Sequence, residues 1–80
     1  MQLRPKPLEV QAIENYCLSV FFDSGEIKIF DVKPLIIGSW YGQLKDRNLF
    51  ESAKIVGNTI EWANGQAICP YDLYYSSVPV

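Results

Sequence analysis

Residues 15–34 read NYCLSVFFDSGEIKIFDVKP, and this stretch decides the fold. It holds two runs rich in β-branched and aromatic residues, 16–22 and 27–32, on either side of the DSGE sequence at 23–26. The Asp readily bonds the backbone downstream of it, and Gly25 can take the positive φ of a hairpin loop. The stretch therefore predicts a β-hairpin closed by a tight turn.

Side chains in the two predicted strands alternate between the faces of a sheet. In the second strand, Ile27 and Ile29 face one way, whereas Lys28, Phe30 and Val32 face the other. The first strand has apolar groups on both faces, which indicates a central strand covered at least in part on both sides. Its two faces are Tyr16, Leu18, Val20 and Phe22 on one side and Cys17, Ser19 and Phe21 on the other.

The segment that follows the hairpin predicts short helices. Pro34 suits the first turn of a helix, where its missing N–H costs little, and Asp31 is placed to cap that turn. Residues 35–44 contain two glycines, so they form either one broken helix or a short helix and a turn. Residues 46–53 predict a second short helix with Asp46 as its N-cap.

Three further segments are predicted to be extended, one before the hairpin and two after the helices. Residues 8–13 alternate between apolar and polar and predict a first strand. Residues 54–56 and 59–62 lie on either side of Gly57-Asn58, a two-residue hairpin signal.

The stronger of the two hairpin signals lies in residues 64–80. Asn64-Gly65 indicates a second turn, across which residues 67–68 can pair. Residues 71–75 predict one helical turn after Pro70, and residues 78–80 are expected to be frayed.

Together these patterns predict a single α+β domain over residues 1–80. Its small antiparallel sheet contains the hairpin 16–32 and the strands near 8–13 and 54–62, and short helices between 34 and 53 cover one face. The alternative is a small, mostly β roll, which requires residues 46–53 to be non-helical. A chain of this length buries roughly 60% of its unfolded surface.

Charge and composition narrow the range of partners. The net charge is −2 and the seven basic residues are scattered, so direct nucleic-acid binding is not expected. The sequence contains no apolar run long enough to cross a membrane and no export signal, which favours a cytoplasmic location. In that compartment Cys17 and Cys69 are expected to be buried, reduced thiols.

Candidate catalytic groups are few. The chain has no histidine, so neither cysteine has the usual base, and two thiols fall short of a structural zinc site. The carboxylates considered for acid–base chemistry are Glu26, Asp31, Glu61 and Asp72, and each has a simpler role in a turn, a cap or a solvated face. The sequence therefore predicts no catalytic, cofactor-binding or metal-binding residue.

Two pairs of adjacent aromatic residues stand out as candidates for protein contact. In Trp40-Tyr41 and in Tyr74-Tyr75, neighbouring rings cannot both face one core from a regular element. One ring of each pair is then exposed, and Trp and Tyr are favoured anchors of protein interfaces.

Five motifs follow one another along residues 8–75: the NYCLSVFF strand, the DSGE turn, the FDVKP exit, WANG and the closing PYDLY. Their order resembles the bacterial domain-of-unknown-function family 2442. The resemblance implies a small α+β fold with no established activity. Some members are fused to a helix-turn-helix domain, and others resemble the second partner of a two-gene module beside family 4160, similar to a toxin–antitoxin pair. Family members often carry Asp where Gln66 stands, so a role of that acid does not carry over.

These observations favour a non-catalytic protein-interaction module, antitoxin-like in a bacterial two-gene module, whose partner is the product of the adjacent gene. The alternative is a small-molecule-binding or catalytic domain that uses acidic residues. It requires an apolar pocket with carboxylates of perturbed pKa around Asp31, Glu61 or Asp72. Apolar surface left uncovered also predicts a weak homodimer, with Trp40, Tyr41, Tyr74 or Tyr75 contributing.

Overall fold

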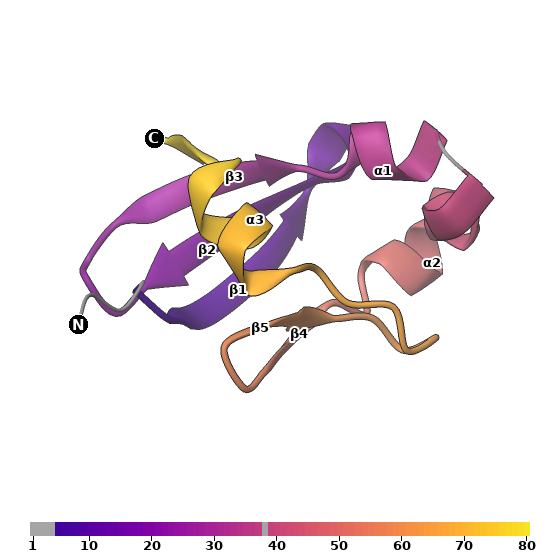
Figure 1. Ribbon diagram of the computed structural model, residues 1–80. Coiled ribbons are helices and arrows are strands. Elements are labelled where there is room, and N and C mark those ends of the chain that lie inside the picture. Colours follow the sequence, from indigo (N-terminus) through magenta and orange to yellow (C-terminus); the bar gives the residue numbers. More distant parts are fainter. Residues whose placement is uncertain (1–4, 38) are drawn as a thin grey trace.

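A four-stranded antiparallel sheet forms the centre of the molecule (Figure 1). The computed structural model describes residues 5–37 and 39–80, and residues 37 and 39–41 by their backbone alone. The strands are β1 (Pro7–Ile13), β2 (Cys17–Phe22), β3 (Ile27–Asp31) and β6 (Val78–Pro79), and this is also their order across the sheet. The predicted α+β class is confirmed, because three α-helices accompany the strands in the part of the chain that the structure describes.

The predicted hairpin is confirmed as β2 and β3. The two strands pair in register from Cys17 with Asp31 to Phe21 with Ile27. Gly25 has φ +92°, a backbone conformation that favours glycine. The Phe22 N–H donates to the Glu26 carbonyl at 2.9 Å and closes the turn.

The strand β2 begins one residue later than predicted, because the turn between β1 and β2 extends to Tyr16. This turn is a 3₁₀ turn, η1 (Glu14–Tyr16), in which Asn15 and Tyr16 have φ of 62° and 55°. Tyr16 therefore belongs to the turn and not to the strand. Its ring packs edge-on against Phe50, with 5.1 Å between centroids, and this contact holds the unusual backbone in place.

The helices begin where capping residues were predicted. The Asp31 carboxylate accepts the Lys33 N–H at 2.9 Å at the start of α1 (Lys33–Ile37), and the Asp46 carboxylate accepts the Asn48 N–H at 3.0 Å before α2 (Arg47–Phe50). Between them lies the 3₁₀ segment η2 (Ser39–Lys45), so these residues do not form one regular α-helix. The helix at α2 is shorter than the predicted 46–53, yet it is helical, which rules out the mostly β alternative.

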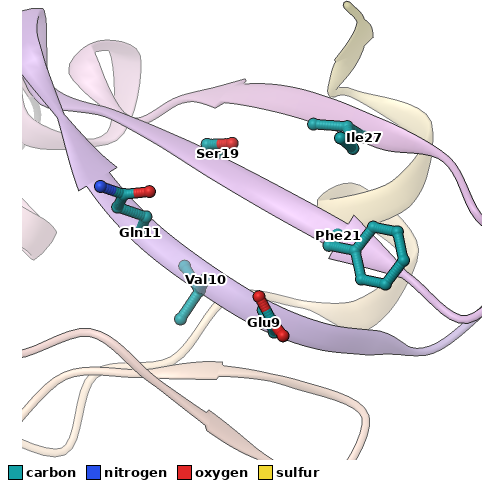
Figure 2. A pocket seen from close by; sticks show the side chains of 6 residues that line it. All are labelled: Glu9, Val10, Gln11, Ser19, Phe21 and Ile27. Atoms are coloured by element: carbon teal, nitrogen blue, oxygen red, sulfur yellow. The ribbon is translucent and has the colours of Figure 1, made fainter.

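The strands predicted near 54–62 form a separate sheet. Among the described residues, β4 (Lys54–Val56) and β5 (Thr59–Glu61) pair as strands only with each other, and an isolated bridge links Glu61 to Ala67. The prediction that they extend the main sheet is wrong. Instead, the β4–β5 hairpin lies alongside β1, as both figures show (Figures 1 and 2).

The C-terminal residues are paired, so the prediction of a frayed end is wrong. Val78 lies opposite Ile29 in the register, and the Val80 N–H donates to the Ile27 carbonyl at 3.1 Å. Pro79 lacks an N–H, but at the edge of a sheet this removes no necessary hydrogen bond.

The hydrophobic core lies on one side of the main sheet. α1, η2 and α2 cover one end of the sheet, while α3 (Pro70–Tyr75) crosses its middle (Figure 1). The Trp62 indole donates to the Phe50 carbonyl at 3.0 Å, which satisfies its buried N–H. No helix among residues 5–37 and 39–80 combines the length and the apolar character needed to cross a membrane. The core residues are Leu18, Val20, Phe22, Phe30, Val32, Ile36, Leu44, Phe50, Ile60, Trp62, Ile68 and Leu73.

Candidate protein-contact face

A candidate site lies on the side of the main sheet that faces away from the core. We call it the open face. Alternate residues of the four strands form it, because successive side chains of a strand point to opposite sides. The register aligns them in three rows: Glu9, Phe21 and Ile27; Gln11, Ser19, Ile29 and Val78; and Ile13, Cys17 and Asp31.

A shallow hollow of about 530 Å³ lies on this face (Figure 2). Figure 2 shows Phe21 and Ile27 on neighbouring strands, with Glu9 and Gln11 on β1 beside them. Ser19 forms the floor between these groups. A hollow this open suits a broad contact better than the enclosure of a small molecule, which is usually 70–90% buried in its site.

Polarity changes across the open face. The β1 side carries Glu9 and Gln11, whereas the β3 and β6 side carries Ile27, Ile29 and Val78. Ile27 is 47% exposed and Val78 is 64% exposed, although both are large apolar groups in strands. Over its first two rows the face thus has an apolar half and a polar half, and in the third row Ile13 lies on the β1 side and Asp31 on the β3 side.

An ionic cluster marks one end of the open face. The Lys33 ammonium lies 3.0 Å from the Asp31 carboxylate, 2.8 Å from the Asn15 carbonyl and 3.7 Å from the Cys17 sulfur. Partial burial would raise the pKa of Asp31, but the hydrogen bonds and charge of Lys33 outweigh it and lower that pKa. The hydrogen bond to Asp31 raises the pKa of Lys33. The two charges therefore compensate each other.

Glu9 is different, because its carboxylate has no ion pair or hydrogen-bond partner within the part of the chain that the structure describes. It stands at the β1 side of the hollow (Figure 2). With Asp31 neutralised by Lys33, Glu9 contributes the uncompensated charge of the open face.

The predicted contact residue Tyr74 is engaged inside the molecule. Its hydroxyl donates to the Glu26 carboxylate at 2.6 Å, its ring packs edge-on against Phe22, and the Lys28 ammonium lies 3.8 Å from the ring centre. The hydrogen bond lowers the pKa of Glu26 and raises that of Tyr74. Tyr74 thus ties α3 to the turn of the hairpin.

Tyr75 is the exposed member of its pair, as predicted for one ring of the two. It is 55% exposed and its ring lies 4.6 Å from that of Tyr71, which is also exposed. Both belong to α3, on the side of the sheet opposite the open face. A role in protein contact stays a prediction for this pair, and the side chains of Trp40 and Tyr41 lie outside the described part of the chain.

The structure brings two of the four candidate carboxylates to one cavity. A second cavity of about 360 Å³ lies between β3, α1 and α3, and Asp31 and Asp72 both line it, beside Cys69. Glu61 lies apart on β5, and Glu26 lies in the hairpin turn. Among the described residues, no three His, Cys, Asp or Glu side chains form a group that could hold a metal ion.

The cysteines differ from expectation in their burial. Both are free, as expected, but Cys69 is exposed and Cys17 is half-buried. Cys69 immediately precedes the proline that begins α3, and at this N-cap position it is exposed.

Sequence reasoning missed the open face as a site. The signal was present, because β3 alternates between Ile27 and Ile29 on one side and Lys28 and Phe30 on the other. It was not decisive, because a strand pattern does not reveal which of two apolar faces the rest of the chain covers.

Comparison with known proteins agrees with the motif order. No curated protein and no solved structure matches the chain significantly. The model of one family of proteins of unknown function, DUF2442, matches residues 7–79, from the first strand to the last. The matched region includes every strand of the main sheet and thus the whole open face. The chain therefore belongs to the DUF2442 family.

Proposed function

We propose that this protein is a non-catalytic protein-interaction module and that the open face is its binding surface. One observation carries the proposal: Phe21, Ile27, Ile29 and Val78 lie together on the sheet face opposite the core, where Ile27 and Val78 are exposed and Phe21 and Ile29 are half-buried. A contiguous apolar area with a polar border is typical of interaction sites.

The cellular setting follows from the family resemblance. Members that stand beside family 4160 resemble one half of a toxin–antitoxin pair. On this basis the protein is the antitoxin-like partner in a bacterial two-gene module, acts in the cytoplasm and binds the product of the adjacent gene. The exposed apolar half of the open face supports such a role, because a partner would shield it from water.

Recovery of a partner tests this function. The tagged full chain is expressed in its native host, and the proteins that co-purify with it are identified by mass spectrometry. We expect the product of the neighbouring gene. A parallel experiment uses Phe21→Thr with Ile29→Thr, which removes apolar surface but keeps good strand residues.

The matched control is Val56→Thr, a similar change at an exposed valine on β4. We expect the partner to be lost with the double variant and retained with the control. Recovery of no specific protein with the unaltered chain would contradict the proposed function.

The second cavity favours one alternative function, small-molecule binding. Its walls include the apolar side chains of Phe30, Leu35 and Ile68, with Asp31 and Asp72 as its charged groups. Asp31 is already paired with Lys33, which weakens its ability to bind a ligand. The test is a thermal-shift screen with small amines: this function requires stabilisation that Asp72→Asn abolishes, and no stabilisation by any amine would rule it out.

A further inference from the structure

We propose that the open face binds an amphipathic helix of a partner protein, with an Arg or Lys of that helix paired to Glu9. The inference rests on the proposed function and names the chemistry of the partner. The apolar side of the helix would lie on Phe21, Ile27 and Ile29. Its basic flank would lie along β1.

The edges of the sheet are unsuited to a partner strand. β4–β5 lies alongside β1 (Figure 1), and the opposite edge, β6, is two residues long and includes Pro79. Strand addition needs a row of free backbone groups, which short edges and prolines do not supply. A partner is therefore expected to lie over the face and not beside it.

A helix fits the dimensions of this face. Strands of five or six residues are roughly 17–20 Å long, and three of them span roughly 10 Å between the outer axes. A helix of about 12 residues is ~18 Å long and ~10 Å wide. Helix-on-sheet layers are also the usual way to bury the second face of a sheet.

The negative charge of Glu9 determines which charge the partner must carry at this position. A carboxylate that is covered without a compensating cation is strongly destabilising, whereas an Arg can bind both of its oxygens. Glu9 lies directly beside Phe21 in the register, so a helix that covers the ring also covers the carboxylate. The partner must then supply a cation at that position.

Other occupants do not meet this requirement. The only cation in β1, β2, β3 and β6 is Lys28, which is buried on the core side, so a second copy packed face to face brings no free cation from its strands. Anionic lipids and nucleic acids are repelled by Glu9 and by the net charge of −2.

The test uses two synthetic 14-residue helical peptides with the same leucine stripe, one with arginines and one with glutamates along the flank. Each is titrated into the ¹⁵N-labelled full chain, and amide shifts report the site and the affinity. We expect the arginine peptide to shift the amides of Phe21, Ile27 and Ile29 and to bind more tightly. In Glu9→Lys, its affinity should fall about fivefold, and the preference should reverse.

Two variants complete the design. Glu61→Lys makes the same charge change on β5, away from the face, and should leave the preference intact. Phe21→Thr should weaken both peptides, and the dispersion of its spectrum shows whether it is folded. Shifts that lie away from the open face, or an unchanged preference in Glu9→Lys, would overturn the inference.

The two proposals fail in different ways. If no native partner is recovered, the proposed function fails whatever the peptides show. If a native partner is lost with Phe21→Thr but binds Glu9→Lys as tightly as the unaltered chain, the proposed function stands and the docking inference is wrong.

Discussion

Phe21 and Phe22 are adjacent in β2, yet they belong to opposite sides of the sheet. Phe22 is fully buried, and its ring packs edge-on against Tyr74 of α3. Phe21 is half-buried beside Ile27 on the open face. The same residue type in the same strand thus stabilises the fold on one side and forms accessible surface on the other, so residue type alone does not identify a core.

The largest expected effect is the contrast between these two phenylalanines. Phe22→Ala removes a fully buried ring and should lower the free energy of unfolding by about 3–5 kcal/mol, enough to unfold a marginal chain. Phe21→Ala should cost about 1 kcal/mol, since the ring is already partly in water. Urea denaturation gives both values. Similar losses would show that the open face is structural.

A smaller effect is expected at Lys28, the buried cation of the core side. Its ammonium donates to the Tyr74 carbonyl at 2.8 Å, and that carbonyl also accepts the Ser77 hydroxyl. Lys28→Met keeps the apolar stem and leaves the carbonyl satisfied, so the free energy of unfolding should fall by only about 1 kcal/mol. A loss near that of Phe22→Ala would mean that the ammonium, and not the apolar packing, holds α3 on the sheet.

The pH dependence of stability reports the link between α3 and the hairpin. The hydrogen bond from Tyr74 lowers the pKa of Glu26, so this carboxylate stabilises the fold fully above its unfolded pKa, about 4.3. The stabilisation is lost as the pH falls through the lower, folded pKa. The pKa of Asp31 is lowered too, and its contribution has the same sign. We expect stability to be level from about pH 5 to 8 and to decline in acid.

The variant Tyr74→Phe distinguishes the contribution of Glu26 to the decline of stability in acid from that of Asp31. It keeps the ring and removes the hydroxyl, so the acid decline should become shallower while the part due to Asp31 remains. The pKa of Tyr74 is raised, so its own contribution is complete below its unfolded value of about 10 and is lost only at higher pH. An acid decline of unchanged slope in Tyr74→Phe would disprove the link. Denaturation midpoints between pH 3 and 7 supply the comparison.

Local chemistry allowed much of this fold to be predicted. The turn at Gly25, the caps at Asp31 and Asp46 and the hairpin alternation depend on interactions within a few residues, and all are present in the structure. The paired end at Val78 could not be predicted in this way, because its partner Ile29 lies about fifty residues earlier in the chain.

The site was harder to predict than the fold. Whether Phe21 is core or surface depends on where α3 and the β4–β5 hairpin lie, and no local pattern determines that placement. Adjacency in the sequence predicts that one ring of each aromatic pair is exposed, but it does not reveal that Tyr74 contacts Glu26 and Lys28. The sequence around Glu9 does not indicate a role for it, because its importance depends on the lack of a cation among its neighbours in the folded sheet.

The smallest expected effect is self-association. Strands β1, β2 and β3, of five to seven residues each, present roughly 300 Å² per chain, so a face-to-face dimer falls below the ~1,200 Å² typical of stable interfaces. Sedimentation should give about 9.1 kDa at micromolar concentration and a rising mass only near millimolar.

Glu9→Gln sharpens this last prediction. It removes the charge that a second copy cannot neutralise, so it should strengthen a dimer that uses the open face. Tyr75→Ser should have no effect on such a dimer, because Tyr75 lies on α3. If Tyr75→Ser abolishes association and Glu9→Gln does not change it, the aromatic pair on α3 is the interface. A chain that stays monomeric in all forms would show that the open face needs a partner of different chemistry, which is the outcome that the uncompensated charge of Glu9 favours.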